Sequence, residues 1–196
     1  MLLIDWTQFL EQGLQLEGRR SAMTVGVFDG VHRGHRTLIE TIVAHNGKQE
    51  TGFVPVIVTF RSSHKTGKPA KNIQTFEEKI KTFEQMGIQI TVVIEFTESF
   101  RRMTGVEFLQ LLLKHGNVGF FAVGGNFRCG YQLDTDAPAI QKFFTTQGIP
   151  AEIVPEVMED NLPISSSRIR AAISQGNLAL AEKMLGRQLS PTQAVP

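Results

Sequence analysis

The chain has little of what marks a disulfide-bonded, membrane-spanning or strongly charged protein. Its 196 residues include a single cysteine, Cys129, so no disulfide can form within the chain, which fits a reducing compartment. The longest apolar runs, such as residues 54–60, are far too short to cross a bilayer. The 20 basic and 19 acidic residues leave a net charge of +1, so the overall charge favours neither nucleic acid nor a membrane as a partner.

What is present is the composition of a soluble globular domain. Hydrophobic residues make up 41% of the chain and charged residues 20%, which is ordinary, and the length suffices for one substantial core. Asp5 and Glu11 interrupt the weakly apolar N-terminus, which therefore lacks the layout of a signal peptide. We expect one soluble domain, located in the cytoplasm.

Short apolar runs alternate with amphipathic segments along the chain. The expected strands cover residues 23–28, 53–60, 88–96, 120–123 and 153–154. Capping-box patterns at Thr75 and Thr104 begin two of the expected helices. Before the first strand we expect only an amphipathic lead-in, and after the last strand one helical pattern from Ile169 to Leu180. The alternation predicts an α/β fold of Rossmann-like type, a doubly wound sheet of five parallel strands with helices on both faces.

The first expected strand ends in a segment suited to phosphate. Asp29-Gly30 breaks the apolar run with a tight turn, and His32 and His35 follow at the start of a helical pattern. Residues three apart share a helix face, so both imidazoles can point the same way. A helix N-terminus at the carboxyl end of a buried strand binds anions, and Gly34 leaves room for one. The segment therefore predicts a phosphate-binding loop with two histidine donors.

A second segment, Pro163–Arg170, places three successive serines before a helical pattern. One interpretation is a serine N-cap followed by two solvated arginines. The other is a polyphosphate site built from hydroxyls, helix amides and a guanidinium. The predicted topology favours the second, because this loop follows the last strand and so shares a sheet edge with the histidines.

The sequence does not support a zinc site, a dinucleotide-binding loop or a P-loop. A zinc ion at His32 and His35 would need further ligands, and no cluster of cysteine and histidine supplies them. There is no G-x-G-x-x-G after the first strand and no Walker lysine. We expect His45 and His115, near helix ends, to be surface or capping groups that are structural or idle, and Cys129 to be an idle thiol.

Several of these segments together resemble one family. The stretch from Phe28 to His35 resembles the HxGH signature of the nucleotidyltransferase superfamily, in the version found in bacterial FAD synthetases. The stretch Ile164–Arg170, with the later Leu-Gly-Arg187, resembles their ISSTRIR segment and trailing Leu-Gly-Arg. The stretch Gly124–Gly130 is similar to their G-x-(N/D)-F-x-F-G loop. These motifs occur in the family's order over nearly the whole chain.

The resemblance implies FMN adenylyltransferase activity. FMN would attack the α-phosphorus of ATP, giving FAD and pyrophosphate, with Mg²⁺ required. Residues 1–187 would form the nucleotidyltransferase domain and 188–196 a C-terminal tail. The family's riboflavin kinase module is not found after Arg187, so kinase activity is not expected and a separate riboflavin kinase is a candidate source of FMN.

The resemblance also assigns site residues, although it leaves the ligands of Mg²⁺ unassigned. The implied catalytic residues are His32, His35, Ser166 and Arg170. The implied ATP-binding residues are Gly26, Val27, Phe28, Asp29, Gly34 and Ser167. The implied substrate-binding residues are Asn126, Phe127, Arg128 and His64.

The chain departs from the family pattern in two loops. Thr59-Phe-Arg-Ser-Ser-His64 stands where family members have Thr-Phe-Glu-Pro-His-Pro, and Cys129 stands where they have phenylalanine. Because of the first change, an adenylyl- or cytidylyltransferase acting on another phosphorylated substrate stays open as an alternative. A nucleotide- or flavin-binding module without turnover is a further alternative, and the complete set of histidines, serines and arginine argues against it.

Overall fold

The computed structural model describes residues 1–46, 52–61 and 72–190, and its centre is a parallel sheet of six strands. The strand order is β1-β4-β3-β2-β5-β8, and every neighbouring pair is parallel. The strands are β1 (Leu2–Asp5), β2 (Ser21–Gly26), β3 (Val54–Phe60), β4 (Ile90–Ile94), β5 (Val118–Gly124) and β8 (Ala151–Val154). The α/β Rossmann-like class is confirmed, but the sheet has six strands rather than five.

The additional strand, β1, lies at the edge of the sheet beside β4. Its side chains do not follow the burial pattern of the central strands, so the apolar pattern of the sequence does not predict it. Leu2 and Leu3 are 56% and 43% exposed, and Ile4 is its one buried residue. Asp5 ends the strand and caps α1 (Trp6–Gln12) by accepting a hydrogen bond from the Gln8 N–H. The expected amphipathic lead-in is therefore a strand followed by a helix.

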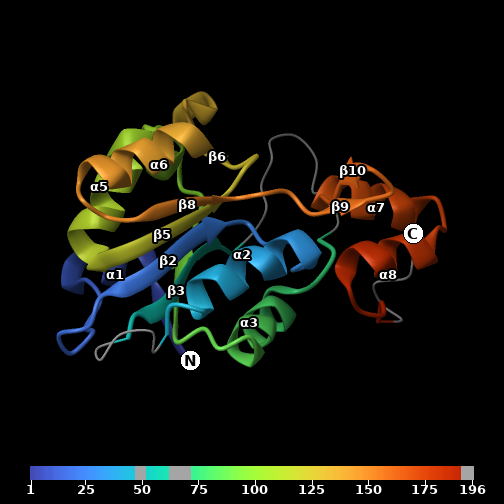
Figure 1. The fold of residues 1–196 in the computed structure, drawn as a ribbon, viewed down its shortest axis with the longest axis horizontal. Helices are drawn as coiled ribbons and strands as arrows, with labels where there is room; N and C mark the ends of the chain where they lie inside the picture. The colour runs from blue at the N-terminus through green and yellow to red at the C-terminus, as the bar shows by residue number, and fades with distance from the viewer. Residues whose placement is uncertain (47–51, 62–71, 191–196) are drawn as a thin grey trace.

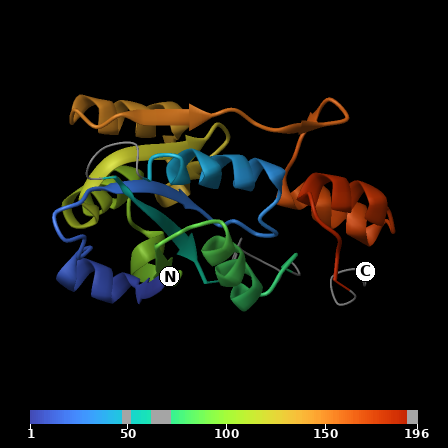
Figure 2. The same ribbon diagram turned by 60° about the horizontal axis from the view of Figure 1, so that its bottom comes forward.

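Helices cover both faces of the sheet, as Figures 1 and 2 show. Phe9 of α1 packs on one face together with α5 (Gly105–Gly116) and α6 (Ala137–Thr146). On the other face lie α2 (Arg33–Val43) and α3 (Phe76–Gln85). The expected capping boxes at Thr75 and Thr104 are both formed. A short helix that the sequence did not predict, α4 (Glu98–Arg101), follows β4.

The C-terminal helices α7 (Ser166–Ser174) and α8 (Leu178–Leu185) form a separate layer beyond the carboxyl ends of the strands (Figure 1). The single helix expected here is wrong. Gly176, with φ +74°, ends the first helix, and Asn177 caps the second. These helices share a hydrophobic cluster of their own: Ile73, Ile164, Ile169, Ala172, Ile173, Ala181, Met184 and Leu185.

Two loops at the carboxyl edge of the sheet carry short antiparallel hairpins. After β5, the pair β6 (Arg128–Cys129) and β7 (Thr135–Asp136) flanks the 3₁₀ turn η1 (Tyr131–Leu133). After β8, the pair β9 (Met158–Glu159) and β10 (Leu162–Pro163) leads into α7. The loops expected at this edge are thus partly ordered by local pairing.

Candidate functional site

The loop between β2 and α2 turns sharply and ends in two stacked histidines. Phe28, Gly30 and Val31 all have positive φ, of 54°, 83° and 39°. His32 is the N-cap of α2, and its Nδ1 accepts a hydrogen bond from the His35 N–H at 3.3 Å. The two imidazole centroids are 3.6 Å apart with 19° between the planes. The rings therefore lie on one side of the helix start, as their spacing predicted.

Burial makes both histidines neutral at pH 7. It lowers the pKa of His32 to about 4. It also lowers the pKa of His35 well below the usual 6.5. Repulsion from the Lys79 ammonium, and from His32 when that ring is protonated, acts in the same direction. Because Nδ1 of His32 accepts a hydrogen bond, its proton lies on Nε2, which is then a neutral donor. Within the described residues, Nδ1 of His35 is buried without a hydrogen-bond partner.

Asp29 connects this loop to the start of α7. Its carboxylate accepts hydrogen bonds from the Ile73 N–H at 2.9 Å and from the guanidinium of Arg170. Its backbone carbonyl accepts one from the Ser166 hydroxyl at 2.8 Å. Burial raises the pKa of Asp29, while the Ile73 N–H and the charges of Arg170 and Lys79 oppose that rise. The two segments that the sequence placed at one sheet edge are thus in direct contact.

The serines before Arg170 have separate roles in the structure. Ser165 is the N-cap of α7 and accepts a hydrogen bond from the Arg168 N–H at 3.2 Å. One serine therefore caps the helix, as predicted. Ser167 is exposed and accepts a hydrogen bond from Arg170 at 3.4 Å. Helix amides, hydroxyls and a guanidinium converge here beside the histidine loop.

The loop after β5 lies at the same sheet edge but is held by a different partner. Asn126 donates a hydrogen bond to Glu156 at 2.8 Å, while Phe127 packs against the main core and Arg128 is exposed. Burial raises the pKa of the Cys129 thiol to about 12, which agrees with the idle thiol expected there. His64, the remaining predicted substrate residue, lies outside the described residues.

The sequence reasoning missed Lys79, which lies beside the site with 6% of its surface exposed. Its ammonium donates to the carbonyls of Val27 and Phe60 and to the Thr59 hydroxyl, at 3.1, 2.7 and 3.2 Å. The helical pattern of the sequence indicates that this lysine is unusual. Lys79 lies four residues before Phe83, on the face of α3 that is otherwise apolar.

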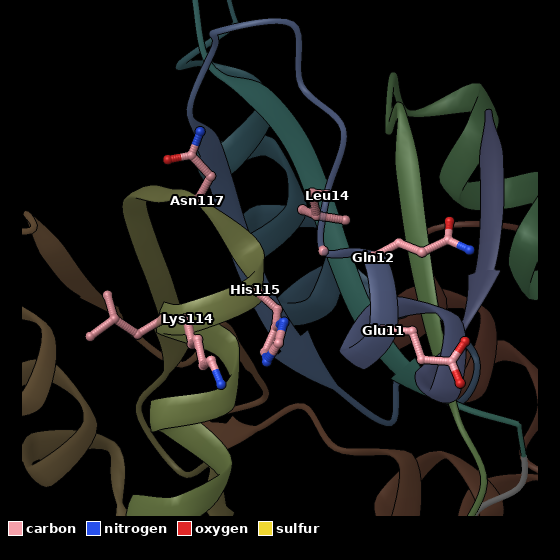
Figure 3. Close-up of a pocket in the computed structure, with 8 residues that line it drawn as sticks. Glu11, Gln12, Leu14, Lys114, His115 and Asn117 are labelled. Atoms are coloured by element: carbon pink, nitrogen blue, oxygen red, sulfur yellow. The ribbon is translucent and has the colours of Figure 1, made fainter.

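A hollow of about 430 Å³ lies away from this site, between α1 and α5 (Figure 3). It is lined by Glu11, Gln12, Gly13, Leu14, Leu113, Lys114, His115 and Asn117. These residues come from the ends of α1 and α5, just before β5 begins, and so mark the amino edge of the sheet. None of the predicted site residues lines this hollow.

Residues 1–46, 52–61 and 72–190 contain neither a cluster of metal ligands nor a membrane-spanning helix. No group of three or more histidine, cysteine, aspartate or glutamate side chains is placed to hold a metal ion in that part of the chain. No helix in it has the length and apolar character needed to span a membrane.

A parallel α/β sheet with a histidine pair and a serine–arginine helix start at its carboxyl edge defines a Rossmann-like fold of the HxGH nucleotidyltransferase type. Comparison with known proteins narrows this class. The model of the FAD synthetase family matches residues 14–168, and the chain belongs to that family.

The relatives agree on the family. The chain is 32% identical over 170 residues to the bifunctional riboflavin kinase/FMN adenylyltransferase of Escherichia coli K12, covering 84% of this chain and 53% of the relative. The protein of the same name from Bacillus subtilis 168 is 32% identical over 177 residues, with 87% and 55% covered. The FAD synthetase of Listeria monocytogenes is 28% identical over 177 residues, with 87% and 70% covered. The chain thus spans about half the length of its bifunctional relatives.

One solved structure confirms the architecture. The crystal structure described as a macrolide-efflux protein from Streptococcus pneumoniae superposes with a TM-score of 0.81 and 26% identity. The match covers 96% of this chain and 61% of that one. The sheet and its helical layers are therefore an arrangement already known in a protein of related sequence.

Proposed function

We propose that this chain transfers the adenylyl group of ATP to FMN, giving FAD and pyrophosphate. The observation that carries the proposal is the junction at Asp29, which joins the histidine loop to the start of α7 in a member of the FAD synthetase family. Curated relatives are named for this activity. Adenylyl transfer needs positioning and charge neutralisation more than a covalent intermediate, and the site offers both.

In this proposal, His32 and His35 donate to the triphosphate. Neutral imidazoles can donate hydrogen bonds to phosphate oxygens in a site from which water is largely excluded, where such bonds are strong. The two rings are packed against each other, so they need little reorganisation as charge builds up around the α-phosphorus. The pair would therefore act on the transition state more than on the bound ground state.

Ser166, Ser167 and Arg170 would hold the β- and γ-phosphates and assist the departure of pyrophosphate. Asp29 orients Arg170, whose guanidinium has further N–H groups to offer a phosphate. The N-terminal amides of α7 add the positive end of a helix dipole at the same place.

The backbone from Gly26 to Asp29 would line the adenosine side of the site. Gly34 keeps the space beside the first histidine open, because a Cβ at that position would lie 3.3 Å from the His32 ring. A larger residue would press on the imidazole that the phosphates are to meet. On the other side, Asn126, Phe127, Arg128 and His64 would contact FMN.

Mg²⁺ would enter bound to ATP. The carboxylate beside the histidines, Asp29, is already engaged by Arg170 and by the Ile73 N–H. We therefore expect phosphate and water oxygens to supply most of the metal's ligands, with the ion neutralising phosphate charge.

We further propose that residues 1–187 form the adenylyltransferase unit, with 188–196 as a tail, and that the unit works in the cytoplasm. A separate riboflavin kinase would then provide its FMN. The last helix, α8, ends at Leu185, close to this boundary.

The test is to incubate the purified chain with ATP, Mg²⁺ and either FMN or riboflavin, and to separate the products by chromatography. We expect FAD and pyrophosphate from FMN and no FMN from riboflavin. If FMN is untouched while another phosphorylated compound is adenylylated or cytidylylated, the flavin assignment is wrong. Binding of ATP and FMN without any product would instead indicate a binding module.

A further inference from the structure

Lys79 is an unusual residue to find buried beside a phosphate site. It is 6% exposed, and within the described residues no acidic side chain forms an ion pair with it. A buried ammonium is costly even when its hydrogen bonds are satisfied, and an apolar side chain would pack here without that cost. Buried ionisable groups of this kind are concentrated at functional sites.

The contacts of Lys79 join the carboxyl ends of two central strands. Val27 follows β2 and Phe60 ends β3, and the ammonium binds the carbonyls of both. The Thr59 hydroxyl, which accepts from Lys79, also donates to the Val27 carbonyl at 3.3 Å. These strand ends lead into the histidine loop and into the segment that departs from the family pattern.

The Val27 carbonyl is next to the residue that supports His35. Phe28 has a φ of +54°, a conformation that a bulky residue adopts only when its surroundings impose it. Its ring lies 5.2 Å from the His35 ring and 5.5 Å from Phe83 of α3. Lys79 therefore fixes the backbone immediately before the residue on which the second histidine packs.

Resting on the proposed function, we propose that Lys79 is a positioning residue of the nucleotide site. Its buried ammonium holds the ends of β2 and β3 in register with the histidine loop, and it places a fixed positive charge behind the triphosphate. The charge is close enough to act on His35 and Asp29. A polyanion at the histidines would feel the same field in a region where water screens it poorly.

Because Lys79 loses its proton close to neutral pH, its effect on ATP affinity should depend on pH. Burial lowers its pKa to about 8, against the opposing effect of Asp29, so its charge is lost between pH 7 and 9.5. The charged and titratable groups around Lys79 are Asp29 with its partner Arg170, His35 and Arg61. Asp29 is paired with Arg170, and the pKa of His35 lies well below this range, so its ring stays neutral. The guanidinium of Arg61 and the ammonium of Lys79 both lie near the ring of Phe76.

The test compares ATP affinity by titration calorimetry at pH 7 and pH 9.5 in the wild type, Lys79→Met and Lys79→Arg. We expect wild-type affinity to fall as the pH rises and Lys79→Met to be weaker by about tenfold at pH 7, with little further change. Lys79→Arg should stay within about threefold of the wild type at both pH values. Lys81→Met, an exposed lysine of the same helix, serves as the matched control and should behave as wild type.

An ATP affinity and pH profile in Lys79→Met equal to those of the wild type would overturn the inference. So would a Lys79→Arg variant as weak as Lys79→Met, since packing alone would then explain the effect. Circular dichroism establishes that each variant is folded, and Lys79→Gln replaces Lys79→Met if that variant does not fold. FAD formation is followed in parallel, so a wild type that binds ATP but makes no FAD contradicts the proposed function while ATP affinity still decides on Lys79.

Discussion

At the scale of single residues, the histidine pair shows how burial sets chemistry. His32 caps α2 through Nδ1 and stacks on His35, which is itself packed on Phe28. Burial keeps both rings neutral at physiological pH. Neutral rings can donate hydrogen bonds to the charge that develops in the transition state. They attract ATP in its ground state less strongly than charged imidazolium rings would.

We therefore expect His32→Ala and His35→Ala each to lower the turnover number by about a hundredfold or more. ATP affinity should change by less than about threefold, because in the proposed site backbone amides and α7 would supply most of the contacts to bound ATP. Steady-state kinetics and calorimetric titration with ATP measure the two effects. His115→Ala, at the opposite sheet edge, is the control, and an equal loss of affinity and turnover in the histidine variants would point to a binding role instead.

The same burial predicts how stability depends on pH. Unfolded His32 takes up a proton near its ordinary pKa of 6.5, whereas the folded form takes it up only near 4. The free energy of unfolding should therefore fall as the pH drops from about 6.5 to 4, by about 3 kcal/mol from this residue. Urea unfolding between these pH values measures the decline.

His32→Asn removes the titrating group and should make the decline in stability smaller. His115→Asn should leave the decline as it is in the wild type. A decline in His32→Asn as large as the wild type's would show that other groups cause it.

At the scale of elements, the attachment of α7 to the β2–α2 loop is the feature that assembles the site. Asp29 binds Arg170 through its carboxylate and Ser166 through its carbonyl. A second connection runs from Arg33 on α2 to Glu159 on β9. The position of the C-terminal layer relative to the histidines thus rests on a few polar contacts as well as on packing.

The Asp29–Arg170 pair should be strongly coupled energetically. Asp29 is buried and Arg170 partly so, and removing one partner leaves the other charge without compensation. A double-mutant cycle with Asp29→Asn and Arg170→Gln, measured by urea unfolding, should give an interaction of about 1–3 kcal/mol. ATP affinity should also fall in Asp29→Asn, because the arginine loses its orientation.

The exposed pair formed by Glu98 and Arg102 on α4 and its cap provides the reference for this cycle. Its interaction should be no more than about 0.5 kcal/mol, as for other solvent-exposed pairs four residues apart. If the Asp29 cycle gave an equally small value, the idea that Asp29 orients Arg170 would have to be abandoned.

At the scale of the whole molecule, the two edges of the sheet carry different features. The carboxyl edge carries the histidine loop, the start of α7 and the loop after β5, while the amino edge carries the hollow between α1 and α5 (Figures 1 and 3). The C-terminal layer has its own hydrophobic cluster and lies across the carboxyl edge. The site is therefore formed where two separately packed parts of the chain meet.

The sequence predicted the central strands because they are buried along their whole length. Every residue of β2, β3 and β4 is buried, so each strand is a mostly apolar run with a few small or hydroxyl residues and no charged ones. The edge strand β1 was missed because most of its side chains face solvent. The division between α7 and α8 was missed because the apolar pattern continues across Gly176.

The sequence predicted where the candidate site lies, but not which of its residues contact one another. Parallel topology was enough to bring the histidine loop and the serine segment to one edge. It gave no means of pairing Ser166 with Asp29, 137 residues away, because such a contact depends on side-chain packing. Lys79 was missed because a lysine among apolar helix positions is usually solvated rather than bound to strand ends.

Adenylyl transfer from ATP to FMN is tested most directly by following the phosphorus atoms of ATP. The chain is supplied with FMN, Mg²⁺ and ATP labelled either at the α- or at the γ-phosphate. We predict that the α label appears in FAD and the γ label in pyrophosphate, with neither label in FMN. Transfer of the γ label to the flavin, or unchanged FMN alongside intact ATP, would contradict the assignment of this site to adenylyl transfer.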